Sequence, residues 1–226
     1  MTWRTRGLLA ALALVSVLGL GVAFPSIIAR LAFFRVRAVE VEGIRFLAAD
    51  EVVRRLDLPA DASILVPLAP LRAAAQAIPG VRAAEVRRRW PGTLQVTLLE
   101  ATPVALHPQD GQMVLLDHHG RVLPFDPARL DTSLPIAPRD SALATLLARL
   151  RVADPDGYAL VESAERDGAD VVLRGRGREL RFRPGAEIAD LRDAALVRQY
   201  LDANEPGWRA IDARFQKWVF VRRSAS

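Results

Sequence analysis

The stretch AEVRRRWPGTLQVTL, residues 84–98, predicts two β-strands joined by a tight turn. In its first half, Ala84, Val86 and Trp90 have the same parity and are expected on one face, with charged residues between them. In its second half, leucine or valine occupies every other position, and this period of two is typical of a strand with one buried face. Pro91-Gly92 is a favoured turn pair. The second strand is expected to bury Leu94, Val96 and Leu98.

The residues before this hairpin predict one strand and two helices. Valine alternates with glutamate over residues 39–42, and Gly43 ends this half-buried strand. Asp50 is expected to cap a first helix that ends near residue 58, and Pro70 to open a second helix that ends near residue 79. Their apolar faces are expected to hold Val52, Val53, Leu56, Leu71, Ala74, Ala75 and Ile78. The order is strand, helix, helix, strand, strand, which is an α+β arrangement.

The residues that follow predict a second, β-rich domain with flanking helices. Asp117 and Gly120 suit a turn between the short strands 114–116 and 122–123. Leucines at positions 143, 146, 147 and 150 mark an amphipathic helix behind a cap at Asp140 or Ser141. Strands are expected at residues 158–165, 169–173 and 178–183, and a further helix at 187–203. Pro206-Gly207 separates that helix from the last strand.

The last strand carries the strongest indication of a binding surface. Residues 211, 213, 215, 219 and 221 share one parity and are expected to face the core, so the opposite face would carry Arg214, Gln216, Trp218 and Phe220. Trp218 and Phe220 would then be exposed on a terminal strand, whose open edge can pair with a strand of another chain. The alternative is a bulge that shifts the register and buries both aromatic side chains.

The N-terminal segment predicts a membrane anchor. Residues 7–29 contain no charged side chain, while Arg4 and Arg6 precede them and Arg30 follows them. A helix of this length, at ~1.5 Å per residue, spans roughly 34 Å and can cross a bilayer. A cleavable signal peptide is the alternative, because it also has a basic start and an apolar core. Arginines lie on both sides of the segment, so their count does not decide its orientation.

The composition excludes several kinds of chemistry. The 226 residues include no cysteine, so the chain has neither a disulfide nor a thiolate nucleophile. The net charge of +5 comes almost entirely from arginine, since Lys217 is the only lysine. The preference for arginine over lysine is explained first by a bias in coding composition, and only second by a surface that binds an anionic lipid or polymer. No serine lies in a nucleophile-elbow context and no glycine-rich loop follows a strand, so the sequence predicts no enzyme and no cofactor.

The remaining candidates for chemistry are a triplet and a basic patch. Asp117-His118-His119, with Asp126 nearby, has the letters of a phosphoesterase metal motif and would make the chain a membrane-anchored metal hydrolase. A hairpin turn explains the triplet better, because the companion ligands of such a motif are missing. His107 is expected in a solvated loop. The basic patch, Arg82 with Arg87 to Arg89, lacks the stacking aromatics of a nucleic-acid site and is expected to be solvated or to bind an acidic segment of a partner.

Several of these segments resemble one known family. Residues 34–106 resemble a POTRA domain, and the runs IPGV (78–81), VRRRWPGTL (86–94) and EATPVA (100–105) are similar to the FtsQ/DivIB cell-division family. The resemblance continues in LLDHHGRVL (115–123), in the Leu-Pro element at 134–136 and in IDARF (211–215). It implies a tail at 1–6, a transmembrane helix at 7–29, a POTRA domain at 34–106 and an FtsQ-type β domain at 107–223.

The resemblance also implies a function. Members of this family are non-enzymatic scaffolds of the bacterial divisome, with a single-pass anchor in the inner membrane and periplasmic domains at the septum. FtsB/FtsL-type coiled-coil subunits would bind the last-strand region, and FtsK, FtsW and FtsI would bind near the membrane and the POTRA domain. The site residues would be Arg214, Phe215, Trp218 and Phe220, with Arg87 and Arg89 as a secondary partner face. No metal, nucleic acid or small-molecule substrate is implied.

An alternative function remains open at this point. POTRA domains also occur in proteins of outer-membrane protein assembly or secretion, where the domain receives client strands. Identification of the proteins that co-purify with the chain separates the two classes.

Overall fold

The computed structural model describes residues 34–130, 133–215 and 218–223. The predicted tail at 1–6 and the predicted anchor at 7–29 lie outside the described residues. Within the part that is described, no helix combines the length and the apolar character needed to span a membrane. The chain divides into two compact units, residues 1–100 and 101–226, so the division falls before the predicted boundary at residue 106.

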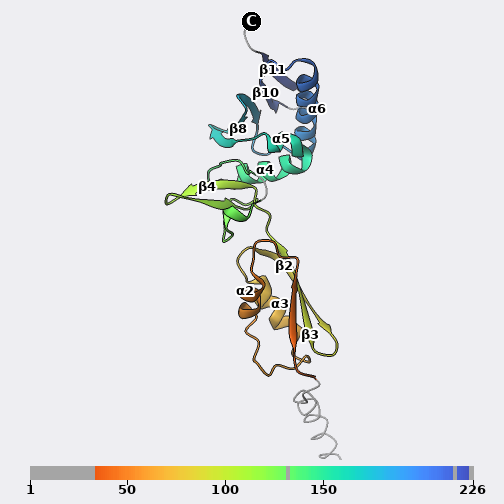
Figure 1. Ribbon diagram of the computed structural model, residues 1–226. Coiled ribbons are helices and arrows are strands. Elements are labelled where there is room, and N and C mark those ends of the chain that lie inside the picture. The colour runs from red at the N-terminus through yellow and green to blue at the C-terminus, as the bar shows by residue number, and fades with distance from the viewer. Residues whose placement is uncertain (1–33, 131–132, 216–217, 224–226) are drawn as a thin grey trace, which may run out of the picture. The chain divides into compact units, whose positions relative to one another are not determined.

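The first unit has the predicted order of elements. Strands β1 (Ala38–Glu42), β2 (Val81–Arg89) and β3 (Thr93–Glu100) form a sheet in the order β1-β3-β2, with β1 parallel and β2 antiparallel to β3. Helices α2 (Ala49–Arg55) and α3 (Leu68–Gln76) pack on one face of this sheet (Figure 1). The core contains the residues that alternation predicted on β3 and the apolar faces of both helices, namely Val52, Leu56, Leu71, Ala75, Leu94, Val96 and Leu98.

Two predictions in this unit are wrong in detail. The cap residue of α2 is Ala48, and Asp50 instead lies in the first turn, where it pairs with Arg54 at 2.7 Å. Trp90 is exposed rather than buried, because it follows the end of β2 and its ring contacts Phe34 edge-on at a centroid distance of 6.1 Å. Both errors concern the ends of elements, where periodicity carries the least information.

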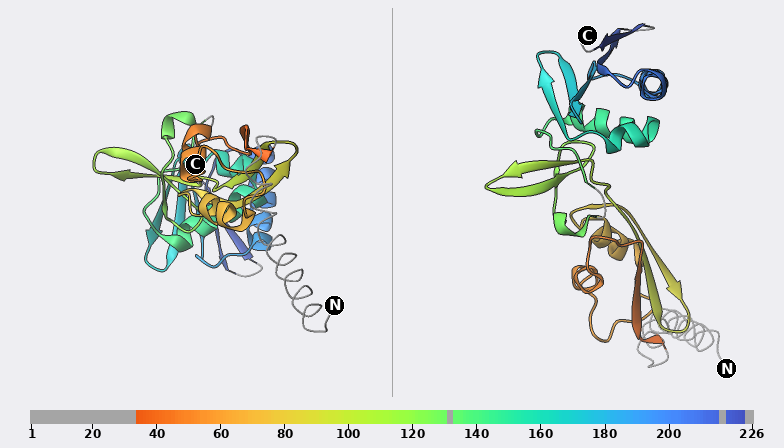
Figure 2. Two further views of the ribbon diagram at one scale, coloured as in Figure 1. Left: turned by 90° about the horizontal axis from the view of Figure 1, so that it is seen from below. Right: turned by 45° about the horizontal axis from the view of Figure 1, so that its top comes forward.

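The second unit contains two sheets. Strands β4 (Ala105–Gln109), β5 (Gln112–Leu116) and β6 (Val122–Leu123) form a small antiparallel sheet, and a single 3-10 turn, η2 (Pro127–Arg129), follows it. A second sheet has the order β11-β10-β9-β8-β7. Its strands are coloured cyan to dark blue in Figure 2. Ile136 bridges the two sheets by parallel pairing with Leu106 and Ser163. The strands of the larger sheet are β7 (Ser163–Asp167), β8 (Asp170–Gly175), β9 (Arg178–Phe182), β10 (Trp208–Phe215) and β11 (Trp218–Arg223).

The helices of the second unit are α4 (Ser141–Ala153), α5 (Pro155–Ala159) and α6 (Ile188–Asn204). Asp140 caps α4 by accepting a hydrogen bond from the Leu143 backbone N–H at 2.9 Å, as predicted. Helix α6 crosses between the parallel strands β9 and β10, and its Leu201 packs with Trp208 and Ile211 in the core. The leucines predicted on the apolar face of α4 are all buried.

Three predictions in this unit are wrong. Residues 158–160 belong to α5 and its end rather than to a strand, because Asp154 and Pro155 start a new helix there. His107 lies on β4, half-buried, with its Nδ1 3.0 Å from the Ala137 carbonyl oxygen, and not in a solvated loop. The last predicted strand is two antiparallel strands, β10 and β11, with Phe215 paired with Trp218.

Candidate interaction site

Strand β11 forms one edge of the five-stranded sheet. Within the described residues, it pairs with β10 only, so its other side offers unpaired backbone N–H and C=O groups. Three aromatic side chains flank this edge, and their exposed fractions are 51% for Phe215, 70% for Trp218 and 56% for Phe220. The predicted exposure of Trp218 and Phe220 is confirmed. Phe215, which strand parity placed toward the core and the family resemblance placed among the binding residues, is exposed with them.

A register shift between Asp212 and Phe215 explains the exposure of Phe215. Ile211 and Ala213, which precede the shift, are buried as predicted. After it, the Phe215 and Phe220 rings contact each other edge-on at a centroid distance of 5.3 Å. The alternative expectation, a bulge that buries Trp218 and Phe220, is wrong: the irregularity exists, but it exposes an aromatic side chain and buries neither of these two.

Shallow hollows lie beside these aromatic residues. One has a volume of about 360 Å³ and is lined by Phe215, Trp218 and Val219 together with residues of α6. Another, of about 310 Å³, is lined by Phe220 with charged residues of β9 and β10. The edge is therefore an uneven surface on which apolar side chains of another chain can be seated. The part that α6 contributes, Asp190, Asp193 and Val197, was not predicted, because no local sequence pattern places this helix beside the β10–β11 hairpin.

Arg214 belongs to an ion-pair network on the sheet. Its guanidinium donates from Nε and Nη2 to the two carboxylate oxygens of Asp212 at 2.8 and 2.6 Å, and from Nη1 to Asp170 at 2.7 Å. The hydrogen bond from Arg214 holds the pKa of Asp212 below its usual range, and the two carboxylates raise the pKa of Arg214. Arg214 therefore fixes the shape and charge of the β10 surface, with its guanidinium already engaged by carboxylates of the same chain.

The predicted secondary face on the first unit is also paired. Arg87 and Arg89 both point to solvent, as the strand periodicity predicted. Arg87 Nε lies 2.8 Å from Glu85 Oε1, and Arg89 Nη1 lies 2.9 Å from Glu40 Oε2. Arg88, between them, is half-buried and donates to the carbonyl oxygens of residues 64 and 66. Both arginines of the predicted secondary face are thus paired with glutamates of the same chain.

The Asp117-His118-His119 triplet forms the predicted hairpin turn. Asp117 is buried, and its Oδ1 accepts hydrogen bonds from the backbone N–H groups of His119 and Arg121 at 2.8 and 2.9 Å. Gly120, with a positive φ of 73°, completes the bend. The carboxylate is therefore occupied by the turn. Among the described residues, no group of three or more His, Asp or Glu side chains is arranged to hold a metal ion.

Comparison with known proteins identifies the family of the chain. An FtsQ-type POTRA domain model matches residues 34–101, which cover the described part of the first unit and Ala101. The "Cell division protein FtsQ" of Thioalkalivibrio sp. (strain K90mix) is 33% identical over 160 residues, which are 68% of this chain. The aligned segment spans 62% of the length of that relative. Since both comparisons lead to the same group of proteins, and the strand–helix–helix–strand–strand order agrees with them, the chain belongs to the FtsQ family of cell-division proteins.

Proposed function

We propose that the chain is a non-enzymatic scaffold of the bacterial divisome, which binds FtsB/FtsL-type coiled-coil subunits and links early and late division proteins. The observation that carries this proposal is the edge of β11 with its three exposed aromatic side chains. Membership in a family of cell-division proteins supports the proposed role in division.

The binding mode we propose is β-augmentation. A strand of the partner adds to β11 through main-chain hydrogen bonds, and Trp218 and Phe220 anchor apolar side chains of that strand. Phe215 extends the apolar surface, while Arg214 keeps the neighbouring surface of β10 charged and ordered. Exposed aromatic residues that become desolvated on binding typically dominate interface energies.

The proposed location is the division septum. Residues 7–29 would anchor the chain in the inner membrane, with residues 1–6 in the cytoplasm and both units in the periplasm. FtsK, FtsW and FtsI are the partners that we propose near the membrane and the POTRA unit, where Arg87 and Arg89 form a secondary face. A reporter fused to the C-terminus tests this topology, since activity only in the cytoplasm would contradict it.

The test of the main contact is a double substitution, Trp218→Ser with Phe220→Ser. It should weaken co-purification of the coiled-coil subunits with the full chain, because hot-spot aromatics contribute about 2 kcal/mol or more each. Circular dichroism should be unchanged, because both side chains are exposed. Recovery of outer-membrane assembly proteins in place of division proteins would favour the alternative function.

The matched control is Leu196→Ser with Tyr200→Ser. These two side chains lie on α6, are exposed to a similar degree, and line neither hollow beside β11. Substitution of these two residues should leave co-purification of the coiled-coil subunits unchanged. Unfolding of the Trp218/Phe220 variant would show that the two aromatics support the fold, and normal binding by a folded variant would place the contact elsewhere.

A further inference from the structure

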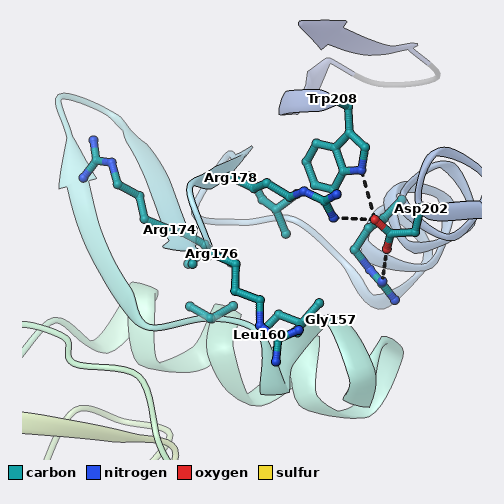
Figure 3. A pocket seen from close by; sticks show the side chains of 12 residues that line it. Gly157, Leu160, Arg174, Arg176, Arg178, Asp202 and Trp208 are labelled. Carbon is teal, nitrogen blue, oxygen red and sulfur yellow. Dashed lines mark hydrogen bonds and ion pairs between the residues drawn. The ribbon is translucent and has the colours of Figure 1, made fainter. Parts of the chain in front are cut away.

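A separate cavity of about 340 Å³ lies in the second unit, and no residue of β11 lines it. It is bordered by α5 and the two residues after it, the β8–β9 hairpin, α6 and the first residue of β10, as Figure 3 shows. Its apolar lining consists of Leu160, Val161, Leu173, Leu180 and Trp208. This lining suits an apolar group, and the volume is at the lower end of the ~300–1,000 Å³ that is usual for ligand sites.

Arginines surround this apolar lining. The β8–β9 hairpin ends in the sequence Arg174-Gly175-Arg176-Gly177-Arg178, and all three arginines contribute to the cavity. Two of them are neutralised within the chain. Arg174 pairs with Glu165 and Glu179, and Arg178 pairs with Asp202 at 2.5 Å while lying over the Trp208 ring at 4.3 Å.

Arg176 differs from its two neighbours. Its side chain extends across the cavity toward α5 (Figure 3). Its backbone N–H donates to Glu162 Oε1 at 3.3 Å, while its guanidinium forms no hydrogen bond or ion pair with the described residues. A guanidinium carries five N–H donors in a planar fork that matches one carboxylate in a bidentate pair. The cavity therefore combines an apolar lining with one unused site for a carboxylate.

The backbone holds Arg176 in this place at a conformational cost. Gly175 pairs with Arg178, so Arg176 and Gly177 form a two-residue loop, with φ values of 50° and 71°. Such loops favour Asn, Asp or Gly at the first position, since other residues rarely adopt a positive φ. The hairpin also contacts α5 closely: a Cβ on Gly175 would lie 1.8 Å from the Leu160 carbonyl oxygen. An arginine held at a positive φ, whose guanidinium has no partner among the described residues, is available to bind a ligand.

We propose that this cavity binds an acidic segment of a partner polypeptide. One apolar side chain of the segment enters the space between Leu160, Leu180 and Trp208, and a neighbouring carboxylate pairs with Arg176. A peptide fits better than a free anion, because the site offers one guanidinium for charge and a larger surface for an apolar group. This site is distinct from the β11 edge and shares none of its residues.

The experiment measures fluorescence anisotropy of a labelled peptide, Ser-Glu-Phe-Glu-Ser, with the purified full chain in detergent at physiological ionic strength. We expect saturable binding. A peptide with Ser in place of Phe, and one with Gln in place of both Glu, should each bind about tenfold more weakly, because each lacks one half of the recognition. Equal binding of the three peptides, or no saturable binding of any, would overturn the proposal.

Substitutions then locate the site. Arg176→Gln should weaken binding of the Phe peptide about tenfold, and Arg139→Gln is the matched control, because Arg139 is exposed in the same unit and outside the cavity. Arg176→Gly should lose the same affinity yet unfold at the same or a higher temperature, since glycine adopts positive φ readily. An equal loss with Arg139→Gln would indicate general charge attraction and contradict the proposal, as would full binding by either Arg176 variant.

Peptide binding at the cavity can be tested separately from partner binding at the β11 edge. The Trp218→Ser/Phe220→Ser variant should bind the peptide as the parent chain does, because neither residue lines the cavity. Loss of peptide binding in that variant, with the fold intact, would assign the peptide to the β11 edge and overturn the cavity site.

Discussion

At the scale of single residues, the second unit depends on a few buried polar groups. The Tyr158 hydroxyl donates a hydrogen bond to the Val104 carbonyl oxygen at 2.7 Å, in a buried position next to the small sheet. Burial raises the pKa of Tyr158 to about 12, against the opposing influence of Arg151, because the ionised phenolate is poorly solvated there. The proton on this hydroxyl is therefore bound more tightly in the folded chain than in the unfolded chain.

This difference predicts a loss of stability in alkali. The contribution of the protonated Tyr158 hydroxyl to stability is fully present below pH 10, the ordinary pKa of tyrosine in the unfolded chain. It is lost as the pH rises toward about 12. Its size is about 2–3 kcal/mol. Tyr158→Phe should cost about 1 kcal/mol at neutral pH and should reduce the decline between pH 10 and 12. Urea unfolding at a series of pH values measures both, and an unchanged alkaline decline in the variant would contradict the assignment.

A second group of this kind is the buried ion pair between Arg198 and Asp154. Arg198 donates from Nε and Nη2 to the two carboxylate oxygens at 2.9 and 2.8 Å, and Asp154 also accepts from the Gly157 backbone N–H. The space there leaves no room for a larger residue at 157, since a Cβ on Gly157 would lie 2.0 Å from Asp154 Oδ2.

Removal of one partner of this pair leaves a buried charge without compensation. Arg198→Met should therefore lower the free energy of unfolding by about 3–5 kcal/mol. Adding Asp154→Asn should restore part of that loss, because asparagine removes the charge and can still accept the hydrogen bond from Gly157. Chemical denaturation of both variants provides the comparison. A double variant that is less stable than Arg198→Met would show that the carboxylate contributes independently of the arginine.

At the scale of elements, the last residue of β3 positions the segment that leads into α2. The Glu100 carboxylate accepts hydrogen bonds from the backbone N–H groups of Arg45, Phe46 and Leu47 at 2.8 to 3.2 Å. Nearby, Gly43 has a φ of 77°, and a Cβ there would lie 2.1 Å from the Leu98 carbonyl oxygen. The missing side chain of Gly43 and the carboxylate of Glu100 together let this segment pass close to β3.

This contact predicts a specific sensitivity of the first unit. Glu100→Gln should destabilise it by about 2–3 kcal/mol, because an amide NH₂ group would face backbone donors in place of a carboxylate oxygen. Glu85→Gln, which affects an exposed partner of Arg87, should change stability by less than about 0.5 kcal/mol. Thermal unfolding of the two variants makes the comparison. Equal stability of the Glu100→Gln and Glu85→Gln variants would mean that solvent replaces the hydrogen bonds of Glu100.

At the scale of the whole molecule, the chain consists of two units with separate cores. The first is built on the β1-β3-β2 sheet, and the second on the larger sheet with α4 and α6. A POTRA unit and a unit with an open sheet edge give the proposed scaffold two surfaces for different partners.

Separate cores predict separate responses to substitution. In native-state hydrogen exchange, Glu100→Gln should reduce amide protection in residues 34–100, and Arg198→Met should reduce it in residues 101–223. Protection in the other unit should stay within experimental error in each variant. A simultaneous loss of protection in both units would show that they unfold as one cooperative body.

The sequence by itself determined the type and order of most elements, because alternation and helical spacing report directly on which side chains are buried. Leu94, Val96 and Leu98 on β3 and the leucines of α4 followed from local periodicity alone. The turn at Asp117 was equally local, since its hydrogen bonds join residues only two and four positions apart.

The tertiary structure alone decided the features that depend on distant segments. The last predicted strand became a hairpin with an exposed Phe215, because a register shift is set by pairing between β10 and β11 and not by the parity of one strand. Arg214 was expected from its parity on the face opposite the core, and its pairing with Asp170, which reaches it from β8 across the intervening strand, was not predicted. The cavity beneath Arg176 needs α5, the β8–β9 hairpin and α6 to converge, and no spacing within any one of these segments encodes that convergence.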